Sequence, residues 1–392
     1  MRLGGKRAIL GALATPAACL LIGLLASGQA GGPEPPKPLL AEQVFKNIQV
    51  LRGIPVKEFM ETMGFFSASL GANCTYCHSD ESSGNWGKYA DDTDRKQTAR
   101  KMILMMNAIN KSYFAGQREL TCYSCHRFGF KPKLIPSLAV QYGDAPIEEP
   151  EEILKQSTGA PAPEQILDKY LQALGGAQRL GRLTSVAAQG TYLGYEDTQK
   201  RPIEIYAKST GQIANVIHTL SGDRTTTYDG RTGWSAAPDT DSPVPVVDLT
   251  GDDLDGARLD AQLFFPAGLK QALSGWLTGN PTTIGDRDVQ VVQGMTARKS
   301  PVKLYFDAET GLLVRVVRYT DSPVGRNPTQ IDYSDYRDVA GIKMPFHVTT
   351  TWTDGRSSVD LTAVQQNVPV DAARFAKPAP PVAPPPAPAQ TR

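Results

Sequence analysis

The chain has 392 residues, which is enough for two or three domains. Its charge is nearly balanced, with 41 lysines and arginines against 40 aspartates and glutamates. Such a balance does not favour a nucleic acid or an anionic membrane surface as partner, so the composition predicts no role in nucleic-acid binding.

Residues 1–30 have the features of an export signal. Basic residues precede an apolar run over 8–26, and small residues follow it up to Ala30. We expect cleavage after Ala30 and a periplasmic or otherwise extracytoplasmic protein. Two alternatives stay open. The run is long enough to serve as an uncleaved membrane anchor, and Cys19 within it is a candidate for lipidation, although Pro16 stands where a lipidation motif has an aliphatic residue.

A Pro-rich tether covers residues 31–41, and three stretches with helical periodicity follow it. They predict helices at 41–51, 55–70 and 93–114. Apolar residues recur at intervals of three and four in each, which gives every helix one face to bury. The predicted buried stripe of the third helix consists of Ala99, Met102, Ile103, Met106, Ile109 and Tyr113.

A five-residue motif, C-x-x-C-H, occurs twice, each time after one of these helices. The first copy comprises Cys74, Cys77 and His78, and the second comprises Cys122, Cys125 and His126. Two thiols three residues apart fit on one helical turn, where both can form thioether bonds to the vinyl groups of a porphyrin, and the histidine can ligate its iron. The motifs use every cysteine outside the leader. The sequence therefore predicts two covalently attached haem c groups.

Other uses of paired cysteines explain less of the pattern. Two C-x-x-C pairs also form structural zinc sites, and cysteines in exported proteins form disulfides, but neither requires a histidine directly after each pair. A redox dithiol is typical of a βαβ context, which neither motif has. Haem attachment is the interpretation that accounts for His78 and His126.

A six-coordinate haem needs a second axial ligand, normally His or Met. Outside the motifs the chain has only His218 and His347, which lie in a distant strand-rich region and are expected to be ordinary sheet residues. Methionines are therefore the expected ligands. Since methionine also fills cores, residue type leaves the choice open. The candidates in the helical region are Met60, Met63, Met102, Met105 and Met106.

The second half of the chain has a different residue pattern, in which strand and turn signals replace helical periodicity. An acidic and then Pro/Ala-rich stretch at 141–162 predicts a linker. A short helix is expected at 163–174, an amphipathic helix at 257–273, and a disordered Pro/Ala-rich tail at 377–392. Between them, β-branched and aromatic runs separated by turn signals predict antiparallel strands. The clearest strands are 201–208, 302–306, 312–319 and 346–352.

Residues 42–135 resemble the cytochrome c subunit of photosynthetic reaction centres. The similarity is carried by Phe45–Leu51, Met63, Ser69–Cys74, Ala99–Met102 and Cys122–His126. That family carries four haems as two dihaem repeats, each with a ligand methionine on a helix before its C-x-x-C-H motif, and this chain matches one repeat. The resemblance implies Met63 as iron ligand of the first haem and Met102 as that of the second, with Met60 and Met106 as the respective fallbacks.

The resemblance implies an electron-transfer protein, with redox proteins as donor and acceptor and no catalysis. A thioether ligand favours Fe(II), so His/Met ligation implies haems of relatively high potential. The alternative is an enzyme of the dihaem peroxidase kind, which also carries two C-x-x-C-H motifs. It would need an open iron beside a catalytic acid, whereas each haem here has a candidate methionine.

Residues 163–376 are similar to the half-barrel of periplasmic lipoprotein-carrier and lipoprotein-sorting proteins. The residues that carry this similarity are Tyr170–Gly176, Phe306–Leu312 and Asp335–Pro345. It implies a curved antiparallel sheet around an apolar cavity. Three roles stay open for this part of the chain: binding of a hydrophobic ligand or membrane, docking onto a partner, and a structural spacer. The expected fold is thus a small all-α dihaem cytochrome c domain at 42–140, followed by a mainly antiparallel β half-barrel domain with a few helices.

Overall fold

A computed structural model of the chain describes residues 37–82, 85–132, 134–136, 138, 141, 143, 151–194, 198–238, 242 and 244–378. The expected signal at 1–30, most of the tether, part of the linker and the tail beyond 378 lie outside the described residues. The described residues belong to one compact unit that begins at Lys37. They include no helix with the length and apolar character needed to cross a membrane.

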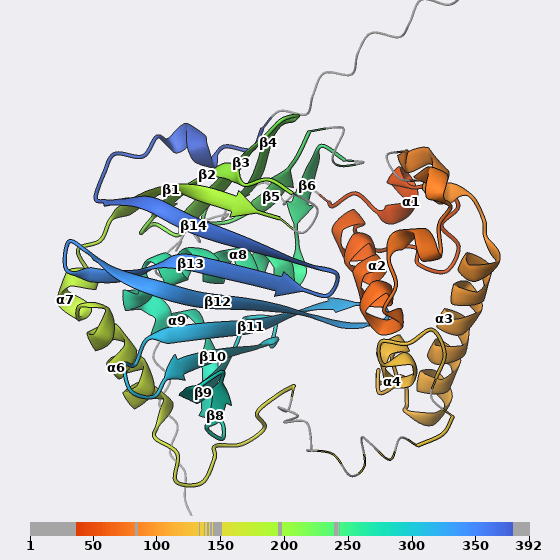
Figure 1. Ribbon diagram of the computed structural model, residues 1–392, viewed down its shortest axis with the longest axis horizontal. Helices are drawn as coiled ribbons and strands as arrows, with labels where there is room; N and C mark the ends of the chain where they lie inside the picture. The colour runs from red at the N-terminus through yellow and green to blue at the C-terminus, as the bar shows by residue number, and fades with distance from the viewer. Residues whose placement is uncertain are drawn as a thin grey trace, which may run out of the picture. The chain divides into compact units, whose positions relative to one another are not determined.

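The first part of this unit, residues 37–132, is helical and is called the helical region here (Figure 1). Its elements are α1 (Ala41–Val44), α2 (Val56–Leu70), η1 (Cys74–Tyr76), η2 (Asp80–Ser82), η3 (Trp86–Ala90), α3 (Asp94–Tyr113) and α4 (Cys122–His126). The second and third predicted helices are confirmed, because local signals set their ends. Gly71 ends α2 with φ 64°, and the Thr93 side chain accepts a hydrogen bond from the Lys96 amide at the start of α3.

The first predicted helix is wrong in length, because α1 has a single turn. The backbone becomes extended at Phe45, and Asn47 adopts φ 61°. The Asn47 side chain donates to the carbonyl of Ala90 and to Oδ1 of Asp92, both at 2.8 Å. These distant partners hold the segment in a conformation that continued helix would not allow.

The predicted stripe of α3 is right only in part. Ile103 and Met106 are buried, whereas Met102 is 42% exposed and Tyr113 is 80% exposed. The exposed members lie on the part of the helix surface that no described protein segment covers.

The second part, residues 151–378, is built on a large sheet and is called the β region here (Figure 1). Its helical elements are α6 (Pro163–Leu174), α7 (Ala177–Leu180), α8 (Gly251–Phe264), η4 (Pro266–Gly268), α9 (Leu269–Ala272) and η5 (Ala372–Phe375). Its strands are β1 (Ser185–Leu193), β2 (Arg201–Lys208), β3 (Gln212–Thr219), β4 (Gly222–Tyr228), β5 (Gly233–Ala236), β6 (Val246–Leu249), β7 (Ser274–Thr278), β8 (Thr282–Ile284), β9 (Arg287–Met295), β10 (Pro301–Asp307), β11 (Leu313–Ser322), β12 (Gly325–Val339), β13 (Ile342–Trp352) and β14 (Gly355–Gln366).

The described strands form one antiparallel sheet that does not close on itself. Its order is β6-β5-β4-β3-β2-β1-β14-β13-β12-β11-β10-β9-β7, and β8 pairs with β9. Each predicted strand coincides or overlaps with an observed one. The expected fold class, a helical region followed by an antiparallel sheet with few helices, is confirmed.

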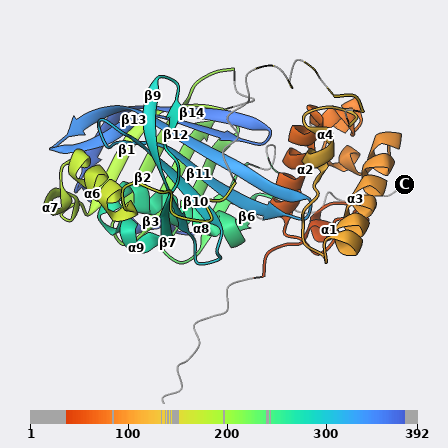
Figure 2. The same cartoon turned by 90° about the horizontal axis from the view of Figure 1, so that it is seen from below.

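Helices α6, α8 and α9 share one hydrophobic core with the sheet (Figure 2). Their own side chains fill that core, and Leu167, Leu304 and Phe306 are almost completely buried. The predicted helix at 257–273 is two helices in the structure, because Pro266 opens a separate short turn between α8 and α9.

Part of the segment expected as a linker is fixed to the sheet. The Ile153 amide donates to Gln293 Oε1 at 2.7 Å, and Gln293 Nε2 donates back to the Ile153 carbonyl at 3.0 Å. Both residues are buried. The chain is therefore anchored to β9 before α6 begins.

Candidate haem-attachment site

The first C-x-x-C-H motif begins directly after α2 and contains the 3-10 turn η1. The Thr93 hydroxyl donates to the Cys77 carbonyl at 2.6 Å. The Arg95 guanidinium lies 3.9 Å from the centre of the Tyr76 ring and donates to the Tyr76 carbonyl at 2.8 Å. The first turn of α3 thus holds the backbone of the first motif in place.

The environment of His78 favours a neutral imidazole. Its ring packs edge-on against Tyr89, with centroids 4.8 Å apart. Burial is the main cause that lowers the pKa of His78, and the charge of Lys96 lowers it further, while the Tyr89 carbonyl opposes both. An imidazole binds a metal in its neutral form, so this shift suits a ligand.

The second motif forms the short helix α4. Thr121 caps this helix by accepting from the Ser124 amide at 3.3 Å. The side chain of Asn110, near the end of α3, makes two hydrogen bonds to the backbone of Leu120. Burial raises the pKa of the Cys122 thiol to about 11.

His126 has the arrangement expected of a metal ligand. Its Nδ1 lies 3.0 Å from the carbonyl oxygen of Gly129. A hydrogen bond there places the proton on Nδ1 and leaves Nε2 available for iron, which is the usual partner pattern of metal-binding histidines. Arg127 and Phe128 have positive φ values of 46° and 63°, which turn the chain so that the Gly129 carbonyl comes within reach.

The structure brings the two motifs together. The ring of Tyr76, inside the first motif, stacks on Phe130, just after the second, with centroids 4.4 Å apart. The Phe128 amide donates to the Ser69 carbonyl at the end of α2, at 2.9 Å. No role at the site was predicted for Tyr76, Phe128 or Phe130. Their only signal is proximity to the motifs, since both phenylalanines are solvent-exposed.

The candidate methionines differ in burial. Met106 is 6% exposed and belongs to a buried cluster with Leu51, Phe65, Ile103 and Val324. Met63 is partly buried and packs against that cluster. Met60, Met102 and Met105 are exposed. Met106 thus packs inside an apolar core, whereas Met102 on the same helix is accessible.

Two other histidines were expected to be ordinary sheet residues. Nδ1 of His347 on β13 lies 2.6 Å from Asp360 on the neighbouring strand β14. Nδ1 of His218 on β3 lies 2.8 Å from Asp223 on β4. Each imidazole has a carboxylate partner on the sheet.

The side chains around the motifs fit a haem group. A porphyrin is a large apolar disc, and several large apolar side chains on α3, α4 and the segment after α4 are exposed: Met102, Leu104, Met105, Tyr123, Phe128 and Phe130. Cys77, Cys122 and Cys125 have free thiols. Within the described part of the chain, no three His, Cys, Asp or Glu side chains gather in one place.

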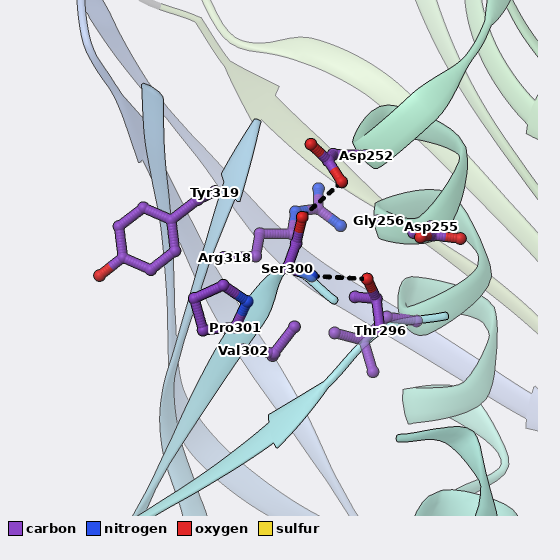
Figure 3. A pocket seen from close by; sticks show the side chains of 10 residues that line it. Asp252, Asp255, Gly256, Thr296, Ser300, Pro301, Val302, Arg318 and Tyr319 are labelled. Atoms are coloured by element: carbon purple, nitrogen blue, oxygen red, sulfur yellow. Dashed lines mark hydrogen bonds between the residues drawn. The ribbon is translucent and has the colours of Figure 1, made fainter. Parts of the chain in front are cut away.

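The β region has a recess between α8 and strands β10 and β11 (Figure 3). The Ser300 hydroxyl donates to Asp252 Oδ1 at 2.6 Å, and the Ser300 amide donates to Thr296 Oγ1 at 3.2 Å. Arg318 pairs with Asp260 at 2.9 Å. These hydrogen bonds and this ion pair connect α8 to the strands, which indicates a structural role for the polar side chains involved.

Comparison with known proteins agrees with the first resemblance noted from the sequence. The family model of the photosynthetic reaction centre cytochrome C subunit matches residues 29–157. The reaction center cytochrome c subunit of Thermochromatium tepidum is 37% identical over 97 residues, which are 24% of this chain and 23% of that protein. That of Rubrivivax gelatinosus is 32% identical over 105 residues, 26% of this chain and 27% of that protein. The chain thus spans about a quarter of the length of these relatives.

Solved structures match the β region with low similarity. A LolA superfamily protein from Nitrosomonas europaea is 15% identical, with a TM-score of 0.39, and the match covers 56% of this chain and 99% of that chain. A putative outer membrane lipoprotein-sorting protein domain from Vibrio parahaemolyticus is 10% identical, with a TM-score of 0.38, and covers 53% and 97%.

Proposed function

We propose that this protein is an exported c-type cytochrome that carries two haem c groups and passes electrons between redox proteins. The observation that carries the proposal is the hydrogen-bond distance between His126 Nδ1 and the Gly129 carbonyl, within a C-x-x-C-H motif. This contact leaves Nε2 for a metal such as haem iron, whereas a Cys₄ zinc site or a disulfide would not use the histidine as a ligand. The match of residues 29–157 to a reaction centre cytochrome family supports the same chemistry.

We assign His78 and Met63 to the first iron and His126 and Met102 to the second. Cys74 and Cys77 would hold the first haem covalently, and Cys122 and Cys125 the second. Met63 is supported by its place on the helix that leads into the first motif. Met102 is supported by its exposure on the free face of α3, in contrast to the buried Met106.

The bound haems would supply reversible one-electron chemistry between ferrous and ferric iron. The protein's own residues would tune it. A neutral thioether ligand favours the ferrous state and raises the potential. Burial raises the pKa of the Cys77 thiol, and the positive charges of Arg95 and Lys96, beside the first motif, oppose that rise. Positive charge there also disfavours ferric iron, so we expect the first haem to have the higher potential.

The stack of Tyr76 on Phe130 supports electron exchange between the two haems. It fixes the first motif against the segment that follows the second. Because the two attachment segments are joined by direct contact, haems bound to them would lie close together. The donor and acceptor would then need access to only one haem each.

The test is haem quantification and the reduced absorption spectrum of protein matured in a periplasm. We expect two haems per chain, no zinc, and no immediate carbon monoxide binding by the reduced protein, because methionine occupies the sixth position of each iron. A colourless or zinc-containing protein would refute the proposal. Immediate carbon monoxide binding would favour the peroxidase-like alternative, since that chemistry needs an open iron.

A further inference from the structure

Helix α2 has two faces with different contacts. Lys57, Glu61, Gly64 and Phe65 follow one another at helical spacing and form one face, which contacts the β region. Met63 lies roughly 140° around the helix from the middle of that face, at 100° per residue. The helix proposed to carry an iron ligand is therefore fixed from its opposite side.

A partly buried ion pair makes the first contact. The Lys57 ammonium donates to Oδ1 of Asp253 on α8 at 2.6 Å and also pairs with Glu61 one turn further along α2. Burial works to lower the pKa of Lys57, but the charges of Asp253 and Glu61 together outweigh it and raise that pKa, so the lysine stays charged. Removing one partner of such a cluster leaves an uncompensated charge at the contact.

The turn between β11 and β12 makes the second contact. Val324 in this turn is 0% exposed. It belongs to the buried cluster whose other members, Leu51, Phe65, Ile103 and Met106, all come from the helical region. The following residue must be glycine, because a Cβ on Gly325 would lie 2.2 Å from the Phe65 ring. A residue of the β region thus completes the core of the helical region.

The turn between β13 and β14 makes the third contact. A Cβ placed on Gly64 would lie 2.9 Å from Thr353 Oγ1 and 3.0 Å from the Asp354 carboxylate. Glycine at this buried position of α2 lets the turn approach the helix backbone. Three separate parts of the β region therefore converge on one face of one helix.

We propose that these contacts, here called the α2 clamp and made by Asp253, Val324, Gly325 and Thr353, position the sulfur of Met63 for the first iron. The inference rests on the proposed function, since it needs Met63 as ligand. The clamp residues are positioning residues, which act on the iron through α2 and through the buried cluster against which Met63 packs. A thioether held at bonding distance stabilises ferrous iron, and a loosely held one does so less. The β region would thereby set the potential of the first haem.

The experiment compares Val324→Asp with Leu220→Asp in the full-length, haem-loaded protein. Both residues are apolar and lie in or at turns between strands, but Leu220 is 87% exposed. In Val324→Asp we expect a weakened sulfur-to-iron charge-transfer band in the ferric protein. At a fixed ambient potential we expect about a tenfold rise in the ferric-to-ferrous ratio of the first haem, equal to ~59 mV for one electron. Amide exchange in α2 should also become faster. Leu220→Asp should change none of these.

A second pair of variants covers the case in which Val324→Asp fails to fold. Asp253→Lys places two ammonium groups together and should weaken the same band and speed the same amide exchange. Adding Lys57→Glu to Asp253→Lys puts the introduced ammonium between two carboxylates and should restore both. Restoration would separate a positioning role from general destabilisation, because the double variant keeps a foreign side chain at both positions.

The results for these variants distinguish a failure of the clamp proposal from a failure of the Met63 ligand assignment. If Met63→Leu leaves the charge-transfer band of otherwise unaltered protein unchanged, the ligand assignment fails, and with it the claim that the clamp positions an iron ligand. Suppose instead that Met63→Leu removes the first haem's share of the band, while Val324→Asp and Asp253→Lys leave the band, the potential and the α2 amide exchange unchanged. The clamp is then refuted and the proposed function stands.

Discussion

The helical region and the β region reach stability in different ways. Strands and helices of the β region bury one another, and Leu304 and Val316 have no exposed surface. The helical region has a buried cluster of only five residues, one of which, Val324, belongs to the β region. Phe128 remains 72% exposed beside the second motif. The β region thus buries its core with its own side chains. The helical region relies on Val324 of the β region and would rely on bound haem to cover its exposed apolar side chains.

The largest expected effect is on the folding of the helical region when one haem can no longer be attached. Replacing Cys74 and Cys77 by serine should remove one haem per chain, because both thioether bonds of the first motif are lost. Folding of the helical region should suffer more than that of the β region, because binding a metal group contributes directly to folding. Haem quantification and amide exchange by region would measure this. Cys19→Ser, in the expected export signal, is the control. An equal loss of amide-exchange protection in the helical and β regions would contradict the expectation that the helical region depends more on haem.

The second prediction concerns the iron ligands. Met63→Leu should lower the potential of the first haem and remove its sulfur-to-iron band, because leucine cannot donate a lone pair. Met106→Leu conserves volume in a buried cluster and should cost less than about 1.5 kcal/mol of stability without moving either potential. Redox titration would distinguish them. The same titration of Met102→Leu should show the loss at the second haem, and a shift in Met106→Leu instead would reassign that ligand.

The third prediction tests whether the core of the β region is stable independently of the helical region. Leu304→Ala removes a fully buried side chain on β10 and should lower the free energy of unfolding of the β region by about 2–5 kcal/mol. The spectrum of the second haem should persist under native conditions, because Leu304 lies in a cluster that contains no residue of the helical region. Urea unfolding followed by β-sheet circular dichroism and by haem absorbance would show whether the two signals separate.

The smallest effect is expected on the exposed side of the sheet. Hydrogen bonds from His347 and Lys200 hold the pKa of Asp360 below its ordinary value. A carboxyl whose pKa is lowered by folding stabilises the protein above its unfolded pKa, and this stabilisation is lost as the pH falls through the folded pKa. Asp360→Asn should therefore cost less than about 1 kcal/mol near neutral pH, since exposed pairs are screened. The cost should vanish in acid, and urea titrations at both pH values would test this.

Local signals made much of the fold predictable. Gly71 and Thr93 mark the ends of α2 and α3 by their own conformation and side chain, so those helices could be placed from neighbouring residues alone. The same holds for α6, which begins at Pro163 and ends before Gly175. The proposed haem-attachment residues also follow from local sequence, because a C-x-x-C-H motif occupies five consecutive positions.

Contacts between distant segments were not predictable. The length of α1 depends on the hydrogen bonds of Asn47 to residues more than forty positions away. The sequence around Val324 predicts only an ordinary turn. Its role in completing the core of the helical region is visible only from its burial against Phe65. The expected burial of Met102 failed because helical periodicity identifies an apolar face without stating what covers it.

The position of Val324 also bears on the order of events during synthesis. Leu51 and Val324 meet in one cluster although most of the chain separates them. Contacts between such distant positions form late, since the intervening segment must first be closed into a loop. As domains emerge from the N-terminal end first, the helices appear long before the turn that completes them. We expect the four motif thiols to stay accessible until that turn packs against the helices, which leaves an opening for haem to be attached to them.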